Sequence, residues 1–172
     1  MSEKHVMRGV VAGIAGGLVA SWVMNQFITG PGMKLQQATQ TPFENVEQKE
    51  HKDDPDSTMK VADAVASVAT GGQHLTLQQQ KSAGPLVHYA FGALMGGLYG
   101  GAAELMPSVK NGFGTTFGSA LFAGADLVAV PALDLAPPAT EEPLPAIGNH
   151  YAAHLVYGAT TELVRRIVRA ML

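Results

Sequence analysis

The sequence predicts an all-α membrane protein: a four-transmembrane-helix bundle with Gly/Ala-rich close packing and a long extracytoplasmic loop. Three observations predict this fold class: uneven placement of charge, four apolar segments of spanning length, and small residues at every fourth position. No charged residue lies between Gly9 and Met33, and only three lie between Gly84 and Leu133. A soluble helix turns one polar face to water, so segments without such a face are typical of a lipid bilayer.

Four segments are long enough to span a membrane, which takes roughly 20 mainly apolar residues. They cover about residues 9–30, 84–106, 111–133 and 147–168. The first also fits a secretory signal, but its apolar run exceeds the usual ~7–15 residues and no A-x-A cleavage site follows. The third and fourth are less hydrophobic because of their Gly and Ala content. A three-span protein with a buried helical pair is therefore the alternative.

Charges beside the spans predict the orientation, because Lys and Arg gather on the cytoplasmic side. Lys4 and Arg8 precede the first span, Lys110 lies between the second and third, and arginines end the fourth. The link between the third and fourth spans contains Glu141 and Glu142 and no basic residue. We therefore expect a single multi-pass membrane domain over residues 1–172, with both termini cytoplasmic.

Residues 31–83 are then an extracytoplasmic loop, whose first half is polar and expected to be irregular. Near residues 59–70 the pattern predicts a short amphipathic helix, begun by Ser57 or Thr58 and ended by Gly71-Gly72. Its expected apolar face comprises Met59, Ala62, Val65, Ala66 and Ala69. This helix lies on the membrane surface or covers the bundle; a linker helix with no role of its own is the alternative.

Small residues recur at spacing four along the first three spans, and this spacing places them on one helix face. The principal helix-packing candidates are Gly13, Gly17, Gly92, Gly96, Gly100 and Gly118. Glycine lets helix backbones approach closely in a membrane, where burial of apolar surface does not drive association. The pattern predicts a tight bundle or a seam between copies of the chain.

Ionisable residues inside spans are costly and need a reason. The candidates for a polar or proton-responsive role are His88, Glu104, Asp126, His154 and Glu162. The orientation places His88, Asp126 and His154 in the outer third of the bundle. An outer His–Asp–His group could exchange protons near neutral pH, or these side chains could simply join helices by hydrogen bonds. Glu104 and Glu162 lie near the inner ends, where Glu104 is expected to meet Arg165, Arg166 or Lys110.

Several functional classes are excluded or disfavoured. A net charge of −3 without a basic stripe argues against nucleic acid as a partner, and the absence of cysteine excludes thiolate chemistry. His150 and His154 have a spacing compatible with metal ligation, but without an HExxH motif we assign no metal and no cofactor. No Ser, His and Asp set supports a nucleophile, so we expect a protein that is not an enzyme.

Three segments carry a family resemblance: HYAFGALMGGLYGGAAELMP at 88–107, VPALDLAPP at 130–138 and AHLVYGATTELVRR at 153–166. Together they resemble the YagU-like family of small bacterial inner-membrane proteins. The likeness covers residues 84–169, is looser at the first span, and does not extend to residues 33–81. It implies an inner-membrane location and a part in acid resistance, with no established biochemical activity. The shared positions are His88, Glu104, His154, Glu162, Arg165 and Arg166, and Asp126 is not among them.

The sequence and this resemblance lead to one expectation and two alternatives. We expect a role in acid stress or in proton or ion homeostasis, carried by the intramembrane His and carboxylate residues. The first alternative is a structural or accessory subunit of a membrane complex without its own chemistry, and the second is a metal- or haem-binding membrane protein. The expected partners are the lipid bilayer and a further copy of the chain or another membrane protein.

Overall fold

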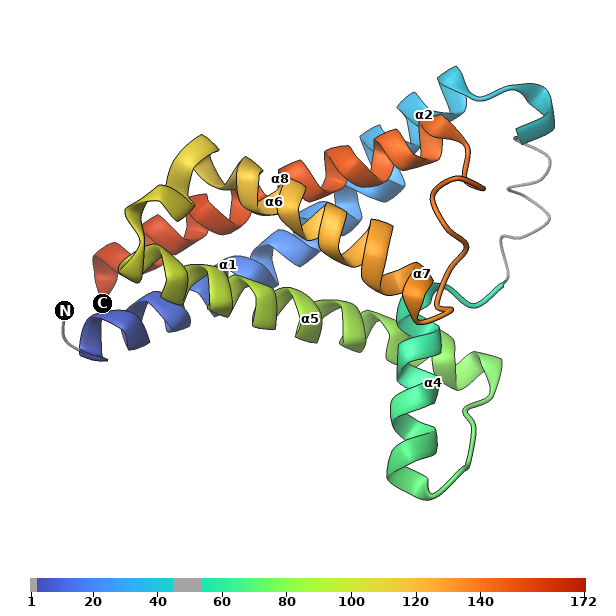
Figure 1. The fold of residues 1–172 in the computed structure, drawn as a ribbon, viewed down its shortest axis with the longest axis horizontal. Coiled ribbons are helices and arrows are strands. Elements are labelled where there is room, and N and C mark those ends of the chain that lie inside the picture. Colours follow the sequence, from blue (N-terminus) through green and yellow to red (C-terminus); the bar gives the residue numbers. More distant parts are fainter. Residues whose placement is uncertain (1–2, 45–53) are drawn as a thin grey trace.

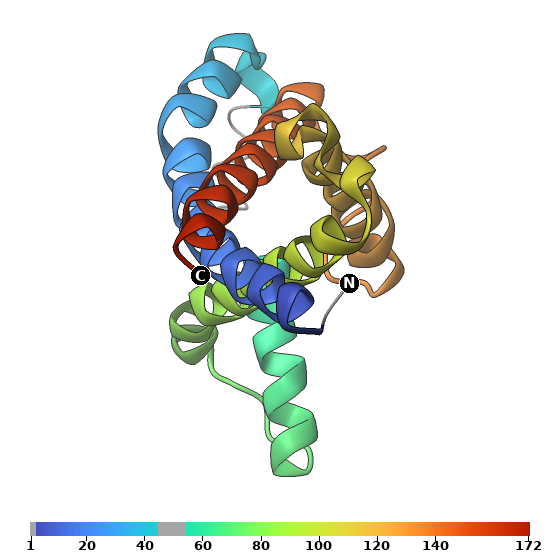
Figure 2. The same cartoon turned by 90° about the vertical axis from the view of Figure 1, so that its left-hand side faces the viewer.

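In the computed structural model, which describes residues 3–44 and 54–172, every regular element is helical, and this confirms the all-α class for that part of the chain. The long helices run side by side along one direction, and both termini lie at the same end of the bundle (Figure 1). Viewed along this direction, α1, α5, α6 and α8 are arranged as a ring (Figure 2).

The first helix is longer than the expected span. It consists of α1 (Glu3–Phe27), a π-helical segment (Ile28–Gly32) and α2 (Met33–Thr39) without a break. Pro31 lies inside the π-helical segment; proline lacks an N–H donor and normally disrupts an α-helix, and here the wider turn accommodates it. The expected loop therefore begins at Gln40 rather than at residue 31, and its residues 45–53 lie outside the described residues.

Helix α4 (Ser57–Thr70) corresponds to the amphipathic helix expected near 59–70. Its N-cap is Asp56 rather than Ser57 or Thr58, because the Asp56 carboxylate accepts a hydrogen bond from the Met59 amide at 2.9 Å. Gly71 ends the helix in the left-handed conformation with φ of 73°, which glycine adopts without steric cost.

Helix α5 (Leu77–Leu105) begins seven residues before the expected start at 84, because Thr76 and Gln79 form a capping box there. A 3₁₀ segment (Pro107–Gly114) then leads into α6 (Thr115–Leu121), a second π-helical segment (Phe122–Ala129) and α7 (Val130–Ala132). Helix α8 (Leu144–Met171) completes the chain and covers the fourth expected span.

Glycine allows α1 and α5 to pack with their backbones in contact. A methyl group on Gly13 would overlap the carbonyl oxygen of Gly96, and one on Gly17 would overlap that of Gly92. Gly100 is similarly close to the backbone of Gly9. These glycines form an antiparallel seam within one chain, where only residues without a side chain fit.

A second glycine contact joins α6 to α8, where a methyl group on Gly118 would overlap the carbonyl oxygen of His154. Gly114 and Gly158 approach each other in the same way. Helix α8 also lies against α1, since a methyl group on Gly16 would meet the carbonyl oxygen of Thr161. The glycine contacts thus bring the polar residues of α8 close to α1, α5 and α6.

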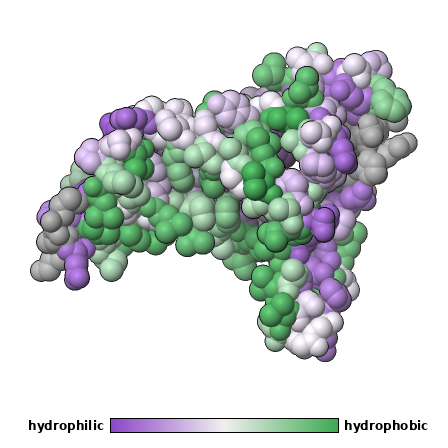
Figure 3. Space-filling model, in the orientation of Figure 1, coloured by the Kyte–Doolittle hydropathy of each residue, from purple (hydrophilic) through white to green (hydrophobic). Residues whose placement is uncertain are grey.

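Hydrophobic residues cover much of the outside of the bundle, while hydrophilic residues gather towards its two ends (Figure 3). Among the described residues, two helices are long and apolar enough to cross a membrane by length and composition, His5–Thr39 and Pro107–Ala132.

Candidate functional site

The most buried charged group in the described bundle is the carboxylate of Glu162 on α8, whose side chain is fully buried. Arg165 binds it in a bidentate manner, with Nε at 2.7 Å from Oε2 and Nη2 at 3.0 Å from Oε1. Arg166 Nε donates to Oε1 at 2.6 Å, and the Tyr99 hydroxyl donates to Oε2 at 2.9 Å. Paired charged hydrogen bonds of this kind are the strong ones in proteins.

The helical repeat explains how these groups meet. Arg165 and Arg166 follow Glu162 at spacings of three and four, which place side chains on one face of α8. Tyr99 reaches the carboxylate from α5 and stacks on Phe117 of α6, with ring centroids 4.5 Å apart. The carboxylate therefore joins α8 to α5, and the stacked Tyr99 ring extends the contact to α6.

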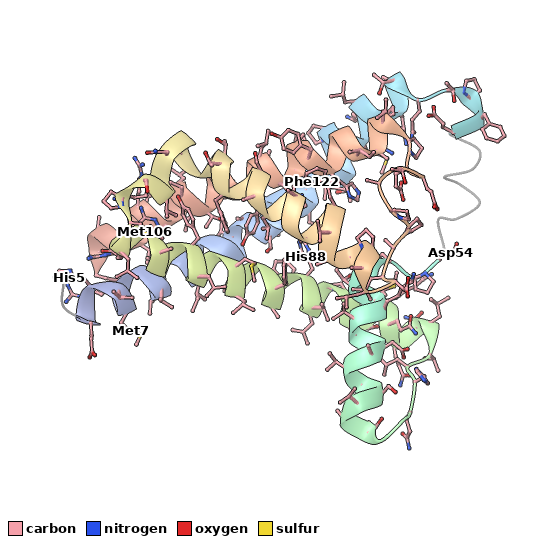
Figure 4. All side chains as sticks on the ribbon, viewed as in Figure 1. His5, Met7, Asp54, His88, Met106 and Phe122 are labelled. Atoms are coloured by element: carbon pink, nitrogen blue, oxygen red, sulfur yellow. The ribbon has the colours of Figure 1, made fainter. Side chains whose placement is uncertain are left out.

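A second carboxylate extends this arrangement to the ends of the chain. Glu104 on α5 accepts hydrogen bonds from Arg169 at 2.8 and 3.3 Å and lies 3.8 Å from Arg165. Arg169 also donates to Nδ1 of His5 on α1 at 3.1 Å; His5 is labelled at the terminal end of the bundle in Figure 4. Of the expected partners, Arg165 lies within ion-pair distance of Glu104, Arg166 pairs with Glu162 instead, and Arg169, which was not among them, makes the shorter contact with Glu104.

We call these residues the glutamate–arginine cluster. Its members are Glu104, Glu162, Arg165, Arg166, Arg169 and Tyr99.

A separate polar group lies towards the other end of α8. Asp126 Oδ2 is 3.7 Å from Nδ1 of His150 and 3.7 Å from Nδ1 of His154. His154 Nδ1 also donates to the carbonyl oxygen of His150 at 2.9 Å. We call these three residues the histidine–aspartate cluster. Its contacts are longer than those of the glutamate–arginine cluster, and the side chains of Asp126 and His150 are 28 % and 58 % exposed.

Local structure positions both sides of the histidine–aspartate cluster. Asp126 lies in the π-helical segment Phe122–Ala129, whose wider turn changes the direction of the side chains that follow it. His150 and His154 are one turn apart on α8. Phe122 packs against the His154 ring with centroids 5.5 Å apart, and it leaves His154 almost fully buried.

His88 does not join this cluster. Its Nε2 lies 3.4 Å from the carbonyl oxygen of Ser21 on α1, and its ring is edge-on to Tyr89. Figure 4 labels His88 on α5 and Phe122 on the helix that carries Asp126, so the two belong to different helices. The structure therefore groups Asp126 and His154 with His150, whereas the sequence had suggested His88.

Sequence reasoning also missed a polar pair beyond the histidine–aspartate cluster. Buried Asn149 donates to Gln36 Oε1 at 2.8 Å, joining α8 to α2. The expected loop boundary at residue 31 had placed Gln36 outside the bundle. Asn149 packs against Gly32, but a glycine beside a proline is locally typical of a break, so the sequence gives no local sign that the helix continues.

Within residues 3–44 and 54–172, no group of three or more His, Asp or Glu side chains is arranged to hold a metal ion. His150 and His154, the pair with ligand-compatible spacing, share a single nearby carboxylate, and it lies 3.7 Å away.

The fold and the two clusters define a helical protein with two apolar helices compatible with membrane association. The chain belongs to the family described as "Protein of unknown function (DUF1440)", whose pattern matches residues 38–163. This match includes the histidine–aspartate cluster and Glu162, as well as part of the segment that the resemblance at the sequence level did not cover. No curated protein and no solved structure gives a significant match.

Proposed function

We propose that the chain is a four-span protein of the bacterial inner membrane, of the YagU-like kind, that acts in acid or proton homeostasis and is not an enzyme. Beyond the two apolar helices, α5 with 29 residues and α8 with 28 are long enough to span a bilayer. Their mean hydropathy is lowered by glycine and by polar residues that face the bundle interior. In α8 these include buried Asn149, His154 and Thr161.

The outward faces of the helices support contact with lipid. On α1, Val11, Leu18 and Trp22 are 42–55 % exposed. On α5, Leu94 and Leu98 are 57 % and 60 % exposed. Contiguous exposed apolar surface of this extent is typical of a membrane or protein interface.

The position of the termini supports an orientation with both ends in the cytoplasm. The two termini lie at one end of the bundle (Figure 1), together with Arg166 and Arg169. Glu141 and Glu142 belong to the connection before α8, at the other end. Basic residues favour the cytoplasmic side.

One observation carries the functional proposal: Asp126 lies between two imidazoles, partly exposed and close to the outer end of the bundle. Imidazole gains and loses a proton near neutral pH, and its charge changes its attraction to the carboxylate. We therefore assign the exchange of protons with the outside to these three residues. The acid resistance implied by the family resemblance agrees with this role.

Proton flux into liposomes that contain the purified protein tests the proposal. We expect an imposed pH gradient to drive flux above that of empty liposomes. Asp126→Asn and His154→Gln should bring the flux to the empty-liposome level, and Glu141→Gln, on the exposed connection before α8, should leave it unchanged. Flux in the wild-type protein equal to that in empty liposomes would remove the transport role.

A structural or accessory subunit is the second candidate, and the glutamate–arginine cluster favours it. The carboxylates of Glu104 and Glu162 are both paired with arginines, so this cluster holds helices together without a free proton-binding group. A membrane protein that co-purifies at fixed stoichiometry, combined with absent proton flux, would support this role. Self-association would have to use the exposed apolar faces, because the α1–α5 glycines are already in contact within the chain.

A further inference from the structure

Helix α4 has two apolar faces, and only one of them is covered. Met59 packs beside Gly84 at the start of α5, and Ala62 is buried in the same contact region. The second face remains exposed, with Val65 at 62 % and Val68 at 87 %. The single apolar face predicted from the sequence included residues that the structure places on these two different faces.

The polar side of α4 points elsewhere. Asp63 precedes Val65 by two residues, which is about 200° around a helix and thus nearly the opposite side. The Asp63 carboxylate binds the ring of His74 at 2.8 Å and the amide of Leu75 at 2.6 Å. Apart from the face that contacts α5, helix α4 therefore has a polar face and an exposed apolar face.

The direction of α4 relates these faces to the bundle. In both Figures 1 and 2, α4 runs across the direction of the long helices and projects away from them, at the end opposite the termini. Figure 3 shows hydrophobic surface on the side of this projection that faces along the bundle towards the termini. In a bundle that spans a membrane, this side faces the hydrocarbon, and α4 is parallel to the membrane surface.

We propose that α4 is an interfacial helix that rests on the outer leaflet through Val65 and Val68. The proposal depends on the four-span arrangement given above. Lipid is the occupant that fits, because the exposed apolar residues continue from α4 onto α5 through Leu86, which is 72 % exposed, to Leu94 and Leu98. An amphipathic helix in this position buries its apolar face at the headgroup boundary and leaves its polar face in water.

Single-cysteine labelling can test this directly, because the chain contains no cysteine. Val68→Cys carries an environment-sensitive fluorophore on the exposed apolar face, and Thr70→Cys, also exposed, carries it on the opposite side. Leu98→Cys reports on the lipid-facing side of α5. Each labelled protein is placed in vesicles of phosphatidylcholine and phosphatidylglycerol that contain spin-labelled lipids, with the label either shallow or deep.

We expect the shallow lipid label to quench the fluorophore at residue 68 at least about threefold more strongly than that at residue 70. The deep label should quench the fluorophore at residue 98. Equal quenching at 68 and 70, with residue 98 quenched, would overturn the interfacial helix and leave the spanning bundle in place. Disulfide-linked dimers of the unlabelled Val68→Cys protein in the same vesicles, together with no lipid quenching of the labelled protein, would overturn it in favour of a second copy as the occupant. No quenching at residue 98 would reject the spanning bundle itself and the interfacial helix with it.

Discussion

The glutamate–arginine cluster and the histidine–aspartate cluster both contain carboxylates, but they differ in partners, burial and contact length. In the former, the fully buried carboxylate of Glu162 accepts hydrogen bonds of 2.6–3.0 Å from two arginines and Tyr99. In the latter, Asp126 is partly exposed and lies 3.7 Å from each imidazole. The comparison points to a stabilising role for the buried glutamate–arginine cluster. The proton-responsive role that we propose for the histidine–aspartate cluster rests on its partial exposure and longer contacts.

The largest effect should come from removing the buried carboxylate. Glu162→Ala leaves Arg165 buried without its main partner, and we expect a loss of about 3–5 kcal/mol in the free energy of unfolding. Thermal unfolding of the purified protein in detergent measures this loss. Glu141→Ala is the matched control, and as a surface change it should stay within about 0.5 kcal/mol of wild type.

A double substitution tests whether the stability lost on removing the Glu162 carboxylate comes from the unpaired charge of Arg165 or from lost packing. Adding Arg165→Met to Glu162→Leu removes the buried charge together with its partner, so part of the lost stability should return. A double variant no more stable than Glu162→Leu alone would show that the unpaired charge of Arg165 is not the cause of the loss.

The next largest effect concerns the close packing that supports the glutamate–arginine cluster. A methyl group on Gly96 would overlap the carbonyl oxygen of Gly13, so Gly96→Ala should cost about 1–3 kcal/mol. The control is Gly124→Ala in the helix that carries Asp126, because a methyl group there meets nothing within 4 Å. Comparable losses from both substitutions in the same unfolding measurement would contradict the α1–α5 seam.

A smaller effect is expected from the histidine–aspartate cluster. Asp126→Asn should change the free energy of unfolding by less than about 1 kcal/mol, because partly exposed ion pairs contribute little. The same substitution is expected to abolish proton flux, which separates its functional effect from its structural one. A stability loss as large as that of Glu162→Ala would remove the contrast between the two clusters.

The smallest effect should arise at an exposed pair outside the spans. The hydrogen bonds from His74 and then from the Leu75 amide hold the pKa of Asp63 below its ordinary value of 3.8. A lowered folded-state pKa stabilises the α4 turn above that ordinary value, and the stabilisation is lost as the pH falls through the lowered pKa. Hydrogen-exchange protection of the Leu75 amide should fall over this acidic range in the wild type. In Asp63→Asn, the Leu75 amide should be less protected at neutral pH, and its protection should not fall further over the acidic range. A fall in protection as large as that in the wild type would exclude Asp63 as its origin.

The sequence allowed prediction of the helical class, because charge-free segments and glycine spacing are local features. It also placed Glu162 one turn before Arg165 and Arg166 on the same helix, and it placed Glu104 near arginines because both lie towards the same ends of their helices. The grouping of His88 with Asp126 failed for a different reason. Whether His88 or His150 faces Asp126 depends on the rotation of α5 and α8 about their axes and on the π-helical turn around Asp126. None of these follows from residue spacing along one helix.

Helix boundaries were the other weak point. The sequence pattern Gly30-Pro31-Gly32 is typical of a break, yet the helix continues to Thr39. The pair formed by Asn149 and Gln36 stabilises this extension from a position more than a hundred residues away. Likewise, Asp56 rather than Ser57 caps α4, a choice that depends on where the first turn begins and not on the residue types, because both are good caps.

In the four-span arrangement proposed above, the unbroken helix from Glu3 to Thr39 has a consequence for how the protein would fit its bilayer. At the α-helical rise it is about 55 Å long, whereas the hydrocarbon core is about 30 Å thick. The excess length is accommodated by tilting of the helix or by protrusion from the bilayer. The tilt angle of this helix therefore depends on the thickness of the surrounding lipid. His5 is held near one end by Arg169 and Gln36 near the other by Asn149. A thinner or thicker membrane therefore acts on both ends of α8 at once.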